Sequence, residues 1–384
     1  MLFRSVVGCS SLGGAAPHYR GAISTRQLGK PFVVTEYASV WWNQYRHDHS
    51  FSFASYAALQ DIDVLTSHAG SVSVRDLNDN PRKLASFCIF NDPVRVAAEY
   101  LGFFMFMRGD VRPADSRVRI AVDTSSIYDS PAAVSPLSSQ QNRLALLTGF
   151  ALECFDKPED LTPLGQRELR LTRSGGSSVV TDLAGFSQLV DAKQTSSEQL
   201  VKLLKNRGLL PADNASDGIS RFESATGELL LDTKRNFMRI NTPRLQGFCA
   251  EAKTTAKAND FSLDQLDERG CVAAVAIDGL KPLRQARRIT IVYATDALNN
   301  RMTFQDEERK TVSRYGDMPI LLKMGRFTAT LKSDHADALK LYALDLAGNR
   351  TREITTVKRS PGQLQFSIDT HRDGTTVFFE LAAE

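Results

Sequence analysis

The first part of the chain combines short apolar runs with one segment of helical spacing. Residues 31–35 form a largely β-branched run that starts with a proline and follows Gly29, which predicts a buried strand. Residues 51–60 carry Ala and Leu at helical spacing and predict a helix, and residues 61–67 predict a second short strand. A strand, a helix and a strand in this order predict a βαβ unit and therefore a parallel sheet.

A further helix is predicted to start at residue 92. Asp92 is a favoured N-cap residue, and Pro93 suits the first helical position. The apolar run over 94–107 continues this helix, which we expect to end near Arg108 because Gly109 follows. Residues 118–122 then predict a strand that starts a new region.

Residues 124–210 have a mixed pattern. The predicted elements are two helices and two strands, at residues 140–155, 197–206, 168–172 and 178–181. Ser196 or Ser197 is the predicted N-cap of the second helix. This part is therefore α/β in character.

After about residue 215 the pattern changes to many short strands. Segments such as GELLLD, VAAVAID, FTATLK and LQFSID are separated by Asp-Gly, Gly-Asn and Pro-Gly turn signals. Short strands at regular spacing are typical of β-sandwiches and barrels. We expect an antiparallel β-sandwich here.

Composition excludes several classes of protein. The 384 residues are 42% hydrophobic and 24% charged, as in ordinary soluble proteins, and the net charge is only +3. No basic stripe interleaved with aromatic residues is present, so we expect no nucleic-acid partner. No run of about 18 apolar residues occurs, so we expect no transmembrane helix.

The residues that ligate metals are scattered. The five cysteines lie far apart without ligand spacing, which indicates single buried thiols. His47 and His49 have no third ligand nearby in the sequence. The sequence therefore predicts no metal site, and no cofactor motif is present.

A carboxylate and a group of aromatic residues follow the first predicted strand. Glu36 stands where that strand stops, and both tryptophans, Trp41 and Trp42, come within six residues of it. A carboxylate at the carboxyl end of a parallel strand is where (β/α)8 barrels place catalytic groups. Aromatic faces stack on sugar rings, and Asn43 and Arg46 could donate hydrogen bonds to sugar hydroxyls.

The stretch GKPFVVTEYASVWWNQYRHDHSFSFASYAALQDIDVLTSHAG at residues 29–70 resembles the strand-seven to strand-eight region of clan A glycoside hydrolases. It is most similar to a bacterial group with the pattern KP…TEW…N.YR.E…..AAYAALQDWD. Residues 90–114 are similar to the last helix of that barrel and its exit. Residues 224–250 are similar to a β-rich segment downstream, and the three blocks keep their order.

The resemblance implies a retaining hydrolase of β-linked polysaccharides or oligosaccharides, with Glu36 as the nucleophile. The substrate-binding residues that it implies are Tyr37, Trp41, Trp42, Asn43, Arg46 and His68. Tyr37 replaces a family tryptophan. Relatives of this type often act outside the cytoplasm, which favours an extracytoplasmic location, although no signal peptide is recognisable.

A complete (β/α)8 barrel takes about 200–250 residues, whereas 35 residues precede Glu36. The family's acid/base glutamate follows strand four, so we expect this chain to lack it and to be inactive alone. The expected fold class is α/β plus all-β. The expected regions are a disordered or ragged segment (1–28), the last two βα units of a barrel (29–114), a mixed α/β domain (115–214) and a β-sandwich region (215–384).

Each candidate residue also has a structural alternative. Glu36 could form a salt bridge at a strand end, the tryptophans could pack in the core, and Asn43 and Arg46 could hold a loop. His68 could be an ordinary polar loop residue. The alternative for the whole chain is a non-catalytic carbohydrate-binding or structural β-sandwich protein.

Overall fold

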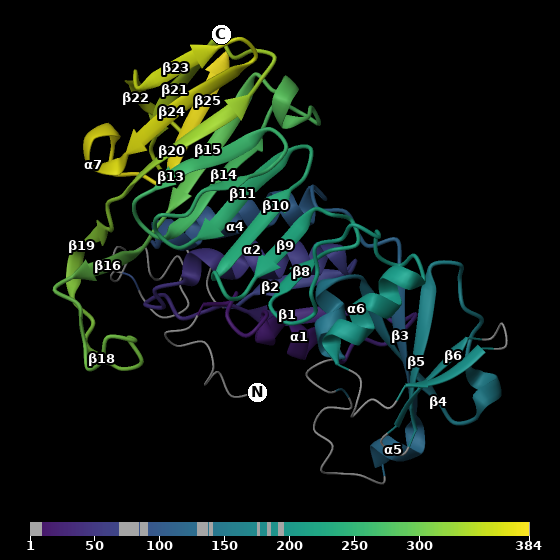
Figure 1. The fold of residues 1–384 in the computed structure, drawn as a ribbon. Helices are drawn as coiled ribbons and strands as arrows, with labels where there is room; N and C mark the ends of the chain where they lie inside the picture. The colour runs from purple at the N-terminus through teal and green to yellow at the C-terminus, as the bar shows by residue number, and fades with distance from the viewer. Residues whose placement is uncertain are drawn as a thin grey trace.

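A computed structural model describes residues 10–68, 84, 91–128, 137, 141–174, 177–182, 186–190 and 196–383. This part of the chain is a mixed α/β structure with many strands and few helices, and a large antiparallel sheet dominates it (Figure 1).

The large sheet has nine strands, all of them antiparallel to their neighbours. In spatial order they are β22 (Arg350–Ile354), β21 (Leu339–Leu344), β25 (Phe378–Ala383), β15 (Arg288–Ala294), β14 (Gly270–Ala276), β11 (Leu245–Ala250), β10 (Phe237–Asn241), β9 (Leu229–Asp232) and β8 (Arg221–Glu223). Every residue of β11 and β14 is buried, because both faces of the sheet are covered there.

A second, five-stranded sheet packs against one face of the first. Its strands are β12 (Ala256–Lys257), β13 (Phe261–Leu266), β20 (Arg326–Lys332), β24 (Gln363–Asp369) and β23 (Val357–Ser360). Side chains of both sheets form one hydrophobic core, in which the Phe248 and Phe261 rings stack 6.0 Å apart. The alternating burial of β20 follows, since one of its faces meets this core.

Two short hairpins complete the C-terminal half. They pair β16 (Ala297–Asn300) with β19 (Asp317–Leu322), and β17 (Thr303–Phe304) with β18 (Val312–Arg314). The short strands predicted after residue 215 are confirmed, and they pair antiparallel throughout.

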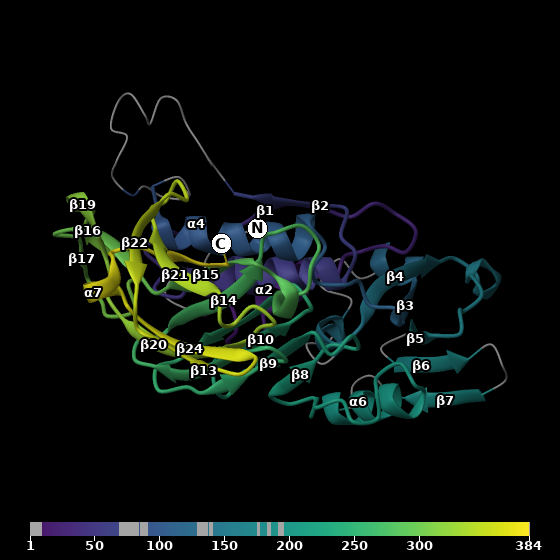
Figure 2. The same ribbon diagram turned by 90° about the horizontal axis from the view of Figure 1, so that it is seen from above.

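Two helices cover the other face of the nine-stranded sheet (Figure 2). They are α2 (Arg46–Leu59) and α4 (Pro93–Gly102), and a π-helical turn over Phe103–Met107 extends α4. Tyr100 of α4 is 2.8 Å from the Thr290 hydroxyl on β15. All 14 residues of α2 are buried, so this helix has no solvent face.

The predicted βαβ unit is confirmed. β1 (Val33–Tyr37) and β2 (Val64–Ser67) pair in parallel, with Val33 opposite Val64, and α2 is the crossover helix. Figure 2 shows α2 and α4 between this two-stranded sheet and the nine-stranded sheet. α4 starts as predicted, because the Asp92 carboxylate accepts a hydrogen bond from the Val94 N–H at 3.0 Å.

The middle region forms a five-stranded sheet. Its order is β4 (Gly149–Phe155), β3 (Arg117–Asp123), β5 (Glu168–Ser174), β6 (Ser177–Asp182) and β7 (Phe186–Val190). β3 is parallel to β4 and β5, and the remaining pairs are antiparallel. Two helices accompany the sheet, α5 (Thr124–Tyr128) and α6 (Ser197–Asn206). α6 matches the prediction, with Ser196 as its N-cap.

The predicted helix over residues 140–155 is wrong. The structure has a short 3₁₀ turn at Asn142–Leu146, followed by strand β4. Leu144 and Leu147, three residues apart as on one face of a helix, are both buried at this turn, although no α-helix follows. β4 then pairs with β3 along its full length, and a Cβ on Gly149 would lie only 2.9 Å from the Ser116 carbonyl oxygen.

The expectation of a ragged segment over 1–28 differs from the structure over residues 10–28; residues 1–9 lie outside the described residues. This segment contains α1 (Pro17–Ile23). Elsewhere in the chain, short 3₁₀ turns lie at Pro158–Asp160 and Leu283–Gln285. Tyr19 stacks on Tyr56 of α2 at 4.9 Å, and Ile23 is fully buried. The segment is ordered because it covers apolar side chains of α2 that would otherwise face water.

Candidate functional site

Glu36 and His68 lie side by side at the carboxyl ends of β1 and β2. The pairing of the two strands is irregular between Val34 and Tyr37, so Glu36 points outward while Tyr37 points inward. The Glu36 side chain is 52% exposed, and its Oε2 is 3.2 Å from Nδ1 of His68. The His68 N–H donates to the Tyr37 carbonyl at 2.9 Å, which fixes the end of β2 against β1. The structure therefore brings together two of the predicted site residues.

Tyr37 forms the layer beneath this pair. Its ring is buried against Phe53 of α2, at 5.0 Å between centroids. Its hydroxyl donates to Oε2 of Glu99 on α4 at 2.8 Å. Burial, together with the Glu99 carboxylate, raises the pKa of Tyr37. Tyr37 is thus a buried residue that joins β1 to α2 and α4, with its ring turned away from solvent.

Glu99 is a second carboxylate near the strand ends, but both of its oxygens already accept hydrogen bonds from hydroxyl groups. Its Oε1 accepts hydrogen bonds from Ser50 at 2.9 Å and from Ser67 at 3.2 Å, in addition to the Tyr37 contact on Oε2. Arg95 lies 3.5 Å from the same Oε1. These contacts tie α4 to β1, β2 and α2 and give Glu99 a structural role.

The two tryptophans pack against each other and against the hairpin region. Trp41 is fully buried, and its ring meets Trp42 edge-on at 5.6 Å. Tyr315 contacts Trp42 at 6.1 Å. Among the described residues, neither indole N–H has a hydrogen-bond acceptor. With no exposed ring face, Trp41 is placed as a packing residue, whereas Trp42 is partly exposed.

Asn43 holds the start of α2. Its side chain is buried, and Oδ1 accepts a hydrogen bond from the Tyr45 N–H at 2.8 Å, which forms an Asx turn. Its carbonyl oxygen accepts from the Arg46 N–H at 3.2 Å. The loop alternative for this residue is therefore consistent with its contacts.

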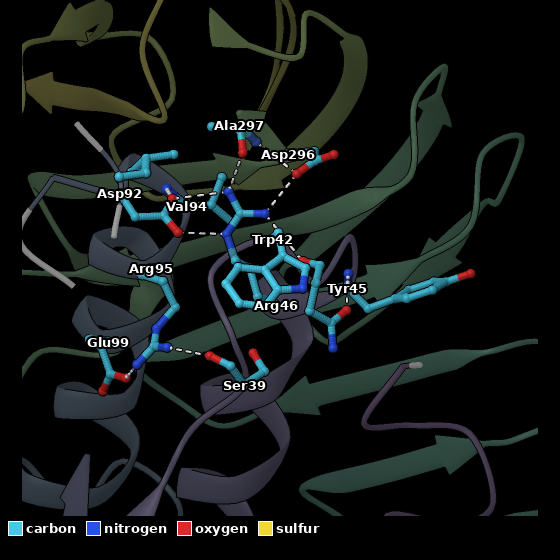
Figure 3. A network of polar contacts seen from close by, with 12 residues as sticks. Ser39, Trp42, Tyr45, Arg46, Asp92, Val94, Arg95, Glu99, Asp296 and Ala297 are labelled. Carbon is cyan, nitrogen blue, oxygen red and sulfur yellow. Dashed lines mark hydrogen bonds and ion pairs between the residues drawn. The ribbon is translucent and has the colours of Figure 1, made fainter. Parts of the chain in front are cut away.

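Arg46 is the centre of a buried ionic network (Figure 3). Nε and Nη2 donate to the Asp92 carboxylate at 2.6 and 3.1 Å, and Nη1 donates to Asp296 at 2.7 Å. The carbonyls of Asn43 and Ala297 accept the two remaining N–H groups. A guanidinium has five N–H donors, so this set of contacts uses all of them. None is left for a sugar hydroxyl.

The electrostatics of this network favour the charged forms. Burial alone would lower the pKa of Arg46, but Asp92 and Asp296 raise it. Arg46 and Arg309 together lower the pKa of Asp296 against its own burial, and Arg309 lies 2.8 Å from Asp296. The network joins α2, α4 and β16, three elements that are far apart in the sequence.

The three residues that follow Arg46, namely His47, Asp48 and His49, are also buried. Burial lowers the pKa of His47 and of His49 to about 3 each, with Arg269 and Arg95 as the next causes. Burial raises the pKa of Asp48 to about 6, although hydrogen bonds from Ser10 and Ser11 oppose this. Within the part of the chain that the structure describes, no group of three or more His, Cys, Asp or Glu residues is placed to hold a metal.

The structure thus divides the predicted site residues into two groups. Glu36 and His68 meet at the exposed strand ends, with Tyr37 behind them. Asn43, Arg46 and Trp41 are buried in the loop and the network, and the partly exposed Trp42 packs beside Trp41. Sequence reasoning missed Glu99, Asp296, Arg309 and Tyr315. No local motif marks the last three, because their partners are distant in the sequence. Asp296 binds Arg46, and both Arg309 and Tyr315 contact Trp42.

Comparison of the chain with protein-family models, with curated proteins and with solved structures returned no match in any of the three. In the described ranges, every helix is too short or too polar to cross a bilayer.

Proposed function

We propose that this chain carries the nucleophile side of a retaining glycoside hydrolase site, with Glu36 as the nucleophile. The observation that supports this most is the position of Glu36, at the carboxyl end of a parallel strand, half exposed and 3.2 Å from His68 on the next strand. That edge of a parallel sheet is where (β/α)8 barrels keep their catalytic groups.

The proposal includes a finer interpretation of the fold. In it, β1, α2, β2 and α4 are the last two βα units of a (β/α)8 barrel, and the two large antiparallel sheets are a β-sandwich. The exposed Val33 and Val64, opposite each other on β1 and β2, support it, because parallel sheets are normally covered on both faces. An extracytoplasmic location belongs to the same proposal.

The chemistry that this site supports is nucleophilic attack. A carboxylate oxygen of Glu36 would bond to the anomeric carbon as the bond to the leaving oxygen breaks, and the leaving group would depart with the electron pair. His68 would orient the carboxylate by its contact with Oε2. An ordinary glycosidic oxygen also needs a general acid, about 5–5.5 Å from the nucleophile. Glu99 does not fit that role, because both of its oxygens accept hydrogen bonds from hydroxyl groups of Tyr37, Ser50 and Ser67.

The test therefore uses substrates whose leaving group departs without a proton. The purified chain is incubated with a panel of 2,4-dinitrophenyl 2-deoxy-2-fluoro-β-glycosides, and intact-mass spectrometry and peptide mapping locate any covalent sugar. We expect one sugar per chain, attached to Glu36. The Glu36→Gln variant should take up none, and a variant of an exposed acid on α6, Glu198→Gln, should label like the parent.

Two results would count against the proposal. One is the absence of labelling across the panel by a folded chain. The other is labelling that persists in Glu36→Gln. In the same samples, turnover of ordinary aryl β-glycosides would contradict the expectation that the chain is inactive alone.

A non-catalytic carbohydrate-binding or structural protein is the second candidate. The burial of Trp41 and the complete engagement of Arg46 favour it, since neither side chain is available to a substrate. This candidate predicts no covalent labelling of Glu36, while oligosaccharide binding, where it occurs, would be unchanged in Glu36→Gln.

A further inference from the structure

A pocket of about 540 Å³ lies far along the chain from Glu36, on the nine-stranded sheet beside β12 and β13. Its walls include Leu230 and Phe237 from the strands β9 and β10, and Leu263 from β13. Such a volume is in the range of small-molecule sites in proteins, about 300–1,000 Å³.

The register of the strands explains which side chains line the pocket. Leu230 pairs with Arg239 on one side and with Glu223 on the other, so these three side chains share one face of the sheet. Arg221 is two residues from Glu223 and therefore points to the same face. The opposite face carries Phe222, Leu229 and Met238, which are buried in the main core.

The lining is strongly positive. Four cations line the pocket, namely Arg221, Arg235, Arg239 and Lys257. The carboxylate in the lining is Asp264, and it already accepts hydrogen bonds from Thr330 at 2.6 Å and from Gln365 at 2.9 Å. Among the described residues, Asp264 forms no ion pair with any of the four cations, so one carboxylate faces four positive charges in the lining.

Nearby carboxylates neutralise only part of this charge. Glu223 lies 3.3 Å from Arg239 and also accepts the Ala215 N–H at 2.6 Å. Among the described residues, no ion pair is found for Arg221, Arg235 or Lys257. Like charges that line one concave site repel each other unless an anion enters.

Arg239 shows this imbalance most clearly. Its Nε–H is buried and has no acceptor in the described part of the chain. Burial lowers the pKa of Arg239, and the neighbouring Arg221 lowers it further, while Glu223 opposes both. A buried donor without an acceptor is unfavourable, and an oxyanion bound to Arg239 would supply an acceptor.

We propose that this pocket binds a small molecule that carries two or more sulfate, phosphate or carboxylate groups. Arg239 of β10 and Arg221 of β8 would hold one group by charge-assisted hydrogen bonds, and Lys257 of β12 and Arg235 of the β9–β10 turn would hold the next. This site is separate from Glu36 and does not depend on the function proposed for it.

The test is isothermal titration calorimetry of the full chain at low and at physiological salt. The probes are pyrophosphate, a disulfated disaccharide, the same disaccharide without sulfate, and inorganic sulfate. We expect at least one of the two polyanions to bind, with an affinity that falls as salt is added. The uncharged disaccharide should not bind, and inorganic sulfate should bind at least tenfold more weakly than the polyanion.

Three variants assign the site. Arg239→Gln, Arg221→Gln and Lys257→Gln should each weaken binding by tenfold or more, which corresponds to about 1.4 kcal/mol. Arg221 and Lys257 are exposed, so their variants remain informative even where Arg239→Gln folds poorly. Lys358→Gln, on exposed β23 outside the pocket, should bind like the parent.

The outcomes separate the sources of the ligand. Binding of the sulfated disaccharide alone points to an acidic sugar, and binding of pyrophosphate alone points to a phosphorylated small molecule. Binding of neither polyanion overturns the proposal, and so does equal binding of inorganic sulfate or an affinity that the three variants leave unchanged.

Discussion

Glu36 and Arg46 lie ten residues apart in one motif, yet the structure places them in opposite environments. Glu36 is half exposed at a strand end and has His68 beside it. Arg46 has no exposed side-chain surface and is surrounded by acceptors. The comparison shows that similarity to a motif does not separate residues that contact a ligand from residues that hold the loop in place.

The physical reason for the difference is the element that carries each residue. β1 has the helices on one face only, so its outward residues remain in contact with water. α2 is enclosed on every side, so its polar residues need partners from the protein. The same argument explains why burial shifts the pKa values of His47, Asp48 and His49. These residues lie within the stretch 29–70 that resembles glycoside hydrolases.

The largest expected effect is that of Arg46→Met. It leaves the carboxylate of Asp92 buried without its guanidinium and removes one of the two cations from Asp296. We expect the free energy of unfolding to fall by about 3–5 kcal/mol, measured by urea denaturation. Arg326→Gln is the matched control, because its ion pair with Asp267 is exposed and should be worth about 0–1 kcal/mol. Equal losses in the two variants would show that the network does not stabilise the fold.

The second prediction concerns pH. Unfolded histidines take up protons near pH 6.5, whereas folded His47 and His49 do so only near 3. Between these values the unfolded state binds more protons, so acidification from pH 7 to 5 should lower the free energy of unfolding. Asp48 opposes this, because its folded pKa of about 6 lies above its unfolded value, which makes its protonation stabilising as pH falls below 6.

Two variants separate these contributions in urea denaturation at several pH values. His49→Gln should reduce the loss of stability on acidification, and Asp48→Asn should increase it. Each change in slope should amount to at most about 1.4 kcal/mol per pH unit. Parallel pH profiles for the parent and both variants would contradict the assigned burial of these groups.

A smaller effect is expected for Tyr37→Phe, which keeps the buried ring and removes the hydroxyl. The lost hydrogen bond to Glu99 should cost about 1–2 kcal/mol, again by urea denaturation. Tyr128→Phe is the control, since Tyr128 is 78% exposed. If Tyr37 also supports Glu36, covalent labelling by the activated fluoroglycosides should slow in Tyr37→Phe and not in the control.

The smallest effect on stability is expected for Glu36→Gln. A half-exposed side chain with one partner should change the free energy of unfolding by no more than about 0.5 kcal/mol. Together with the loss of labelling predicted above, this would identify Glu36 as a residue of function and not of folding. A loss comparable to that of Arg46→Met would instead support the salt-bridge alternative for Glu36.

Local signals predicted much of the fold. The Asp92-Pro93 and Ser196 starts of α4 and α6 were recognisable, because a cap depends on residues within one helical turn. Short apolar segments separated by turn signals indicated the strands after residue 215. The failure over 140–155 has a tertiary cause, since β4 is a strand only by virtue of its pairing with β3.

The candidate site was predicted less completely. The sequence indicated Glu36 and, through the second strand, His68, because parallel strands bring their carboxyl ends to one edge. It could not indicate that Asp296, 250 residues beyond Arg46, would bind the guanidinium. Nor could it indicate that Tyr315 would pack on Trp42.

By itself, the sequence determined the local elements of this protein: the βαβ unit, the capped helices and the run of antiparallel strands, since each depends on the spacing and backbone preferences of neighbouring residues. Only the tertiary structure decided which polar residues are available to a ligand. It left Glu36 open and enclosed Arg46, and it gathered Arg221, Arg239 and Lys257 around one pocket. Burial and charge pairing depend on segments far away in the chain, which no local pattern contains.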